Sequence, residues 1–184
     1  MWPFCYNSGM NYLYHRVPQD QQGTVLEPLN QLKISNSELY KIKAAKYQGR
    51  EHILERRIPI LDCLWNDVLH FSPVPPAELK ASLLEAGMED KEWSFYQIDP
   101  SLFERENTVT YLHKDIGRIS VPDASEFVPF NANNLPELSH IPNATMQYWK
   151  DQYAKSAKPL IFLGIPHILY RGTLDTVNLP VVTV

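Results

Sequence analysis

Glycine and cysteine are scarce in this chain, and each shortage excludes a class of site. Only seven of the 184 residues are glycine, and neither common kind of glycine-rich phosphate-binding loop is present. The two cysteines, Cys5 and Cys63, are too few for a disulfide framework, and no Cys-x-x-Cys pair or Cys/His cluster indicates zinc. We therefore expect no bound metal, and we expect the reducing environment of the cytoplasm.

Long apolar runs are missing as well. No stretch approaches about eighteen uninterrupted apolar residues, so the sequence predicts no membrane span and no membrane partner. The start of the chain lacks a basic stretch followed by an apolar one, so we expect no secretory signal peptide. The net charge of -4 argues against a protein whose main task is to hold a nucleic acid backbone, although a local basic patch can still bind a nucleotide.

The composition and the pattern of predicted elements indicate a single α+β domain over residues 1–184, with residues 1–9 at its periphery. Hydrophobic residues make up 44% of the chain and charged residues 21%, as in ordinary globular proteins. Helices are predicted at 38–57, 77–86 and 143–155, and the tract 24–33 is either a helix interrupted by proline or a strand and turn. Strands are predicted at 12–17, 60–65, 68–71, 93–99, 108–113, 159–163, 168–170 and 181–184, and a long loop at 116–138.

The predicted helix 38–57 is the most basic part of the chain. Ser35 and Glu38 have the spacing of a capping box, and Pro59 ends the helical pattern. Residues 36–57 hold six basic side chains against three acidic ones. Four of the basic residues recur at helical spacing and form what we call the basic stripe: Lys43, Lys46, Arg50 and Arg57. The stripe suits a bound phosphate, but a solvated helix face screened by Glu51 and Glu55 explains it equally well.

The predicted strand 12–17 places a histidine among apolar neighbours. Because side chains alternate along a strand, Leu13, His15 and Val17 share one face. A histidine in this position is more often a satisfied structural residue than a ligand-binding one. Both interpretations stay open from the strand alone.

The stretch YHRV at 14–17, the helix that ends in Glu55-Arg56-Arg57 and the run LWNDVLHFSPVPP at 64–76 resemble one known family when taken together. That family is the DarT-type ADP-ribosyltransferases, in which a Tyr-His-x-Thr strand is followed by a helix with Glu-Arg-Arg. A His-Asp-Tyr-Val-Pro-Phe-Tyr-Phe run then leads into a proline-rich helix start. The resemblance covers roughly Tyr12 to Leu79. It implies a split mixed or antiparallel β-sheet with flanking helices that holds NAD in a cleft.

The resemblance also implies roles for individual residues. His15 would hydrogen-bond the nicotinamide ribose or amide, Arg57 or Arg50 would grip the pyrophosphate and the reacting centre, and Tyr47 and Phe71 would supply aromatic surface. NAD would be the substrate, and its ADP-ribose would pass to a nucleic acid or protein acceptor. The residues expected to bind NAD are His15, Arg16, Tyr47, Arg50, His70 and Phe71, and those expected to take part in catalysis are Glu51, Arg57 and His167.

Two departures from the family pattern keep other interpretations open. The late strand that carries the family's catalytic glutamate reads KPLIFL here, without an acid, and Val17 stands in place of the motif's threonine. One interpretation is that an acid from elsewhere in the chain replaces the family's glutamate, and the candidates are Glu51, Glu126 and Glu137. Another is a cationic pair, His167 and Arg171, at a phosphate.

Two functions without catalysis remain as alternatives. One is a nucleotide-binding or ADP-ribose-binding module. The other is an interaction protein, such as a bacterial toxin–antitoxin or phage-defence component. For the latter we expect Trp65, Trp93 and Trp149 as exposed anchors.

Overall fold

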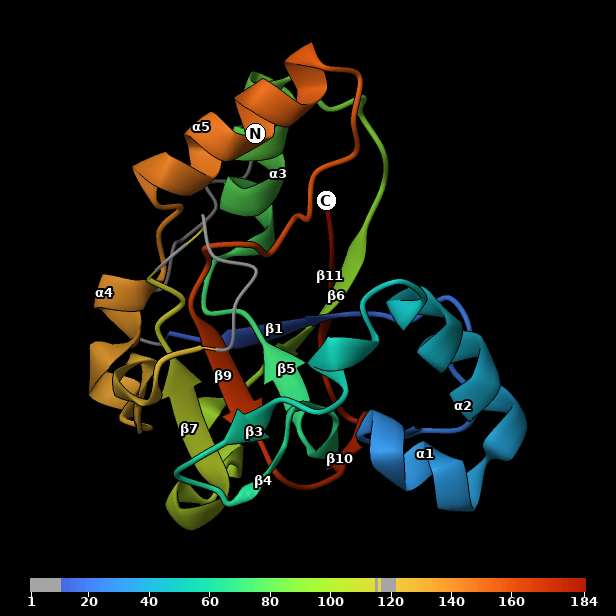
Figure 1. Cartoon of the computed structure of the whole chain (residues 1–184). Helices are drawn as coiled ribbons and strands as arrows, with labels where there is room; N and C mark the ends of the chain where they lie inside the picture. The colour runs from blue at the N-terminus through green and yellow to red at the C-terminus, as the bar shows by residue number, and fades with distance from the viewer. Residues whose placement is uncertain (1–10, 115, 117–121) are drawn as a thin grey trace.

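The computed structural model of the chain describes residues 11–114, 116 and 122–184. The expected peripheral extension at 1–9 and the first cysteine, Cys5, lie outside these residues. Within them the chain forms a mixed α and β structure with several small antiparallel sheets and five α-helices (Figure 1). None of the helices in this described part combines the length and the apolar character that a membrane crossing needs.

Two sheets form the centre of the molecule, and every strand pair in them is antiparallel. The three-stranded sheet has the order β1-β6-β11, formed by Leu13–Arg16, Ser94–Ile98 and Val181–Thr183. The four-stranded sheet has the order β5-β9-β7-β8, formed by Leu69–Phe71, His167–Tyr170, Thr108–Tyr111 and Phe127–Pro129. Two small pairs join β2 (Val25–Leu26) to β10 (Leu174–Asp175) and β3 (Arg57–Ile58) to β4 (Cys63–Leu64).

Among the described residues, one isolated β-bridge joins the two larger sheets. The backbone N–H of Tyr14 donates to the carbonyl of Ser72 at 2.8 Å, and the N–H of Ser72 donates back to Tyr14 at 2.9 Å. Tyr14 belongs to β1 and Ser72 directly follows β5, so the bridge links an edge strand of each sheet. His15, the next residue along β1, therefore lies where the two sheets meet.

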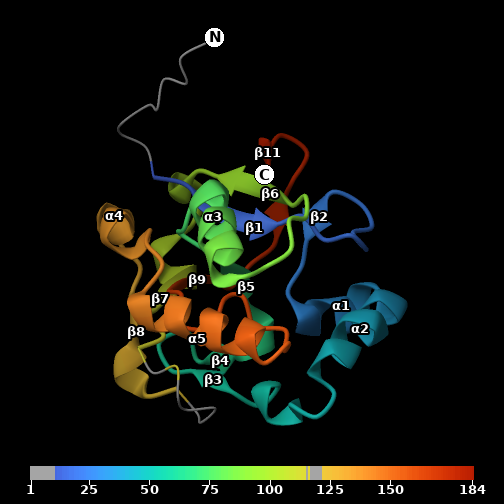
Figure 2. The same cartoon turned by 90° about the horizontal axis from the view of Figure 1, so that it is seen from above.

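The helices cover different sides of these sheets (Figures 1 and 2). α3 and α5 lie side by side at one end and share a core cluster with Trp93 and the fully buried Trp149. α1 and α2 form a separate pair beside β1. The helices span Leu29–Ser35 (α1), Ser37–Ala44 (α2), Pro76–Ala86 (α3), Leu135–Leu138 (α4) and Asn143–Ala154 (α5).

Helix α3 shows how local chemistry sets both ends of a helix. Pro76 occupies the first turn, where its missing N–H costs no hydrogen bond. Gly87 caps the other end with φ 111°, a left-handed conformation that side chains resist. The predicted helix at 77–86 is confirmed.

The predicted helix 38–57 is wrong beyond its first two turns. Asn36, not Ser35, caps α2, because its side chain accepts the N–H of Leu39 at 3.1 Å. The helix ends at Ala44, and a 3₁₀ turn at Ala45–Tyr47 leads to Gly49 with φ 77°. A second 3₁₀ turn follows at Glu51–Ile53. The chain reverses at Gly49, so the four cations of the basic stripe do not share one helix face.

Several other elements differ from their prediction. The tract 24–33 contains both a strand and a helical segment, because β2 is followed by α1 after Pro28. The tract 60–71 forms β4, a 3₁₀ turn and β5, but β4 pairs with β3 and β5 with β9. Within 116–138 the described residues contain β8 and α4 rather than only loop. The predicted strand at 159–163 is wrong, because the chain is irregular up to residue 160 and forms a turn at 161–164.

Truncation of Leu13 tests the joint between the sheets. Leu13 is fully buried in the core cluster that also holds Phe71 and Ile98. Leu13→Ala should lower the free energy of unfolding by about 2–5 kcal/mol in urea titrations, because it leaves a cavity. The matched change Leu102→Ala, at a side chain that is 52% exposed, should cost only about 0.5 kcal/mol. Equal losses at the two positions would contradict the assignment of Leu13 to the core.

Candidate functional site

A hollow of about 570 Å³ opens between β1, the loop that follows it, and helices α1 and α2. We call it the lysine hollow, because Lys43 and Lys46 line it together with His15 and Asp20. Its further lining residues are Arg16, Val17, Pro18, Gln19, Glu27, Leu29, Leu32 and Tyr47.

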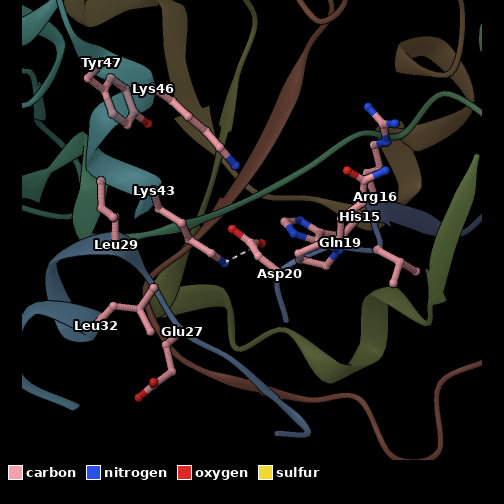
Figure 3. A pocket seen from close by; sticks show the side chains of 12 residues that line it. His15, Arg16, Gln19, Asp20, Glu27, Leu29, Leu32, Lys43, Lys46 and Tyr47 are labelled. Carbon is pink, nitrogen blue, oxygen red and sulfur yellow. Dashed lines mark ion pairs between the residues drawn. The ribbon is translucent and has the colours of Figure 1, made fainter. Parts of the chain in front are cut away.

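Figure 3 shows how charged groups face one another in the lysine hollow. Lys43 and Asp20 point toward each other, with Nζ and Oδ1 4.0 Å apart and both side chains mostly buried. Burial lowers the pKa of the Lys43 ammonium, and the Asp20 carboxylate partly offsets this. Lys46 extends toward the same space from the next helical turn. Of the three cations that line the hollow, Arg16, Lys43 and Lys46, only Lys43 forms an ion pair with an acid of the described wall, Asp20.

A second hollow, of about 420 Å³, lies on the other side of Tyr47. We call it the histidine hollow, because His70, His113 and His167 line it. Aromatic and aliphatic side chains make most of its remaining wall, and two arginines add positive charge. These residues are Lys46, Tyr47, Arg50, Arg56, Trp65, Tyr111 and residues 160–163.

The two hollows adjoin. Lys46 and Tyr47 line both of them. On the sheet side, Nδ1 of His15 in the lysine hollow lies 2.8 Å from the carbonyl oxygen of His70, whose ring lines the histidine hollow. The two hollows are therefore neighbours that share Lys46 and Tyr47 in their walls.

Backbone carbonyls determine which ring nitrogen carries the proton in three of the histidines. A carbonyl oxygen only accepts, so the nitrogen that contacts it must carry the hydrogen. His15 donates through Nδ1 to His70, His70 through Nε2 to Trp65 at 3.1 Å, and His167 through Nδ1 to Ile165 at 2.7 Å. In the neutral ring the other nitrogen is then an acceptor, which is Nε2 in His15 and His167.

Burial holds these rings in the neutral form. It lowers the pKa of His70 to about 4 and that of His167 to about 3, with a further lowering from neighbouring histidines. It also lowers the pKa of His15, against the raising effect of the bond to the His70 carbonyl. At neutral pH these histidines are hydrogen-bonding groups rather than charges.

The structure brings most of the predicted binding residues to the two hollows. His15, Tyr47, Arg50 and His70 line them, and so does the predicted catalytic residue His167. Phe71 is buried, and its ring lies 5.5 Å from that of His15, so it supports the histidine from behind. Arg16 lines the lysine hollow, but its guanidinium stacks over the Trp93 ring at 4.8 Å.

Two predicted catalytic residues lie elsewhere. Arg57 is exposed on β3 and pairs with Asp62, and it is not among the described residues that line either hollow. Glu51 is exposed and accepts the N–H of Gly49 at 2.8 Å, so it stabilises a turn. Arg57 is displaced because the helix that was to carry it ends at Ala44.

The other candidate acids are also absent from the described walls of the hollows. Glu126 is buried and accepts the N–H groups of Lys114 and Asp123, so its role is to stabilise a loop. Glu137 is exposed on α4. Among the described residues, Asp20 and Glu27 are the acids that line a hollow. Asp20 was missed because it lies in a polar loop without a recognisable pattern.

Trp65 and His113, which line the histidine hollow, and Arg171, which is not among its described lining residues, also were not expected in their observed roles. Trp65 was expected as an exposed anchor, and it lines this wall instead, while Trp93 and Trp149 are buried. Arg171 was expected beside His167 at a phosphate, but it donates to the carbonyl of Leu61. No pattern in the sequence indicated a role for His113, because it lies near His167 only through the pairing of β7 with β9.

Cys63 is buried and not in a disulfide, and burial raises the pKa of its thiol to about 11. Among the residues that the structure describes, no group of three or more His, Cys, Asp or Glu side chains is arranged to hold a metal ion. Comparison of the chain with protein-family models, with curated proteins and with solved structures finds no match.

The lowered histidine pKa values predict acid sensitivity. Above pH 6.5, the ordinary histidine value, His70 and His167 are neutral in both folded and unfolded chains. Below it, only the unfolded chain takes up protons until pH falls to about 4 and about 3, so stability falls with pH in that window. We expect each ring to cost about 1–2 kcal/mol of unfolding free energy at about pH 5.

Urea titrations at about pH 7.5 and about pH 5 measure this loss. His167→Phe should reduce the difference between the two pH values, whereas His140→Ala, at an exposed position outside the described hollow walls, should leave it unchanged. A pH dependence that is identical in all three proteins would show that His167 titrates normally.

Proposed function

We propose that this protein binds NAD across the lysine and histidine hollows and transfers its ADP-ribose to a nucleic acid or protein acceptor. The observation that carries the proposal is that the two hollows adjoin through Lys46 and Tyr47. Their volumes of about 570 and about 420 Å³ fall within the range of roughly 300–1,000 Å³ for small-molecule sites. Two adjoining hollows suit a dinucleotide, which has two ring systems joined by a pyrophosphate.

Cations lie where the pyrophosphate would pass. Lys46 lines both hollows, Lys43 lines one and Arg50 lines the other. All three come from the basic stripe, which α2 and the turns after it bend around the site. Hydrogen bonds between such cations and phosphate oxygens are roughly twice as strong as neutral ones.

His15 is suited to a ribose hydroxyl or an amide N–H. Its Nδ1 donates to the His70 carbonyl, which leaves Nε2 as an acceptor on the ring that lines the lysine hollow. Hydroxyl and amide groups donate hydrogen bonds, so they match this nitrogen. Tyr47, between the hollows, supplies an aromatic surface on which a ring of the ligand can stack.

Transfer requires cleavage of the bond between nicotinamide and the ribose. The bonding electron pair leaves with nicotinamide, the acceptor's nucleophile bonds to the ribose carbon, and the nucleophile loses its proton. Positive charge develops on the ribose during this step, and a preorganised carboxylate stabilises it. Asp20 is the acid best placed for this role among the described lining residues, since it shares the lysine hollow with His15.

A non-catalytic NAD-binding or ADP-ribose-binding module is the second candidate. The observation that favours it is the lack of a carboxylate among the described residues of the histidine hollow. Binding in the same two hollows then occurs without bond cleavage.

Calorimetric titration with NAD tests binding. Arg50→Ala should weaken the affinity by about 1–3 kcal/mol, because it removes a charge-assisted bond to phosphate. Arg57→Ala is the matched control and should leave the affinity unchanged, since Arg57 is exposed and pairs with Asp62. If the wild-type protein binds neither NAD nor ADP-ribose, both candidate functions are wrong.

Release of nicotinamide from NAD separates the two candidates. A transferase should release nicotinamide in the presence of its acceptor, and Asp20→Asn should slow release at saturating NAD by about tenfold or more. Binding of NAD without any release, over a panel of nucleic acid and protein acceptors, would support the binding module instead. An Asp20→Asn variant with wild-type turnover would remove Asp20 from the chemistry.

A further inference from the structure

The walls of the two hollows differ in charge. Three cationic side chains line the histidine hollow, Lys46, Arg50 and Arg56, and the described part of its wall contains no aspartate or glutamate. The lysine hollow also has three cations, but its wall includes the carboxylates of Asp20 and Glu27. A positively charged ligand group is therefore less favourable in the histidine hollow than in the lysine hollow.

The histidines show that the wall of the histidine hollow disfavours positive charge. Burial lowers the pKa of His113, the Glu126 carboxylate opposes this, and the charge of Arg56 adds to the lowering. Burial also lowers the pKa of His70 to about 4 and that of His167 to about 3. The environment that keeps these rings neutral opposes a cationic ligand ring in the same way.

Much of the remaining wall is apolar or aromatic. The leucine, isoleucine and phenylalanine side chains of residues 160–163 form one part of it, and Trp65 and Tyr111 form another. The Trp65 and Tyr111 rings pack edge to face with their centroids 5.4 Å apart, and the Arg56 guanidinium lies over the Trp65 ring at 6.0 Å. Trp65 is only partly buried. Such a wall suits a flat, neutral base, because aromatic rings and guanidinium groups both stack on bases.

We propose that the histidine hollow holds the adenine of NAD, and that the lysine hollow holds the nicotinamide and the ribose attached to it. In NAD the nicotinamide ring carries a positive charge and the adenine is neutral, so each ring matches the charge of its hollow. This orientation rests on the proposed function, because NAD is the ligand that it orients.

The same orientation places the reacting ribose beside the groups that the transfer needs. The His15 ring and the Asp20 carboxylate lie close together in the lysine hollow (Figure 3). Lys46, which lines both hollows, is left for the pyrophosphate between them. The reverse orientation would put the bond that breaks in the histidine hollow, whose described wall has cations and no carboxylate to stabilise the developing positive charge.

Calorimetric titrations with the two halves of NAD test this orientation. AMP carries the adenine, and nicotinamide mononucleotide carries the cationic ring. Trp65→Leu removes an aromatic surface of the histidine hollow, so it should weaken AMP by about tenfold and leave nicotinamide mononucleotide unchanged. Weaker binding of nicotinamide mononucleotide with unchanged AMP would overturn the inference.

A second variant adds charge to the histidine hollow instead of removing a ring. Leu160 lines this hollow and is 49% exposed, so an acid can be placed there. Leu160→Asp should not tighten nicotinamide mononucleotide, because its cationic ring lies in the other hollow. In the reverse orientation the new carboxylate would attract that ring and tighten its binding several-fold.

Leu102→Asp is the matched control for the added charge. Leu102 is 52% exposed and is not among the described residues that line either hollow, so this variant should change the affinity of neither half. Thermal unfolding checks that each variant is folded. If Trp65→Leu does not fold, the response of nicotinamide mononucleotide to Leu160→Asp decides the orientation.

Titrations with NAD and ADP-ribose separate this inference from the proposed function. Both ligands contain adenine, so Trp65→Leu should weaken both by the same factor. If NAD binds but Trp65→Leu spares AMP, the adenine site is wrong and NAD binding stands. If AMP and ADP-ribose show the expected pattern while NAD does not bind, the adenine site stands and the proposed transfer falls.

Discussion

The Tyr14–Ser72 bridge is the constraint on which the rest of the structure depends. Its two backbone hydrogen bonds are the point where the three-stranded and four-stranded sheets meet. Because β1 is held there, His15 lies within hydrogen-bonding distance of the His70 carbonyl on the neighbouring strand. Both adjoining hollows border this joint, so their relative position follows from the pairing of backbone groups rather than from flexible side chains.

The chemistry of the site follows from backbone groups as well. Carbonyls of Trp65, His70 and Ile165 each accept a hydrogen bond from a histidine, and the N–H of Gly164 donates one to a fourth ring, that of His113. Burial keeps these imidazoles neutral, so each presents a defined donor or acceptor instead of a charge. Positive charge comes separately from Lys43, Lys46 and Arg50. The neutral hydrogen-bonding groups of the site are thus separate from its positively charged groups.

Local signals in the sequence predicted some elements well. Proline at the start of α3 and Gly87 at its end are sufficient to define that helix, and alternation identifies β1 and the buried side of Leu13. The resemblance to the ADP-ribosyltransferases, rather than these local signals, led us to expect His15, Tyr47, Arg50, His70 and His167 in a site, and all five line the two hollows.

Other features depend on contacts that no local pattern contains. The basic helix looks continuous to Arg57 in sequence, but it ends at Ala44, the chain turns at Gly49, and Arg56 lies over the Trp65 ring. His113 meets His167 only because β7 pairs with β9, more than fifty residues away along the chain. Asp20 enters the site through the loop that follows β1. Long-range pairing, which single-sequence patterns do not encode, decided these positions.

The central claim is that NAD binds in the two adjoining hollows. A crystal structure of the protein soaked with NAD tests this claim most directly, because it shows where NAD binds. The account predicts ligand density that runs from the histidine hollow past Lys46 into the lysine hollow, with the pyrophosphate beside Lys46. NAD bound at another surface, or both hollows empty at saturating NAD, would contradict it.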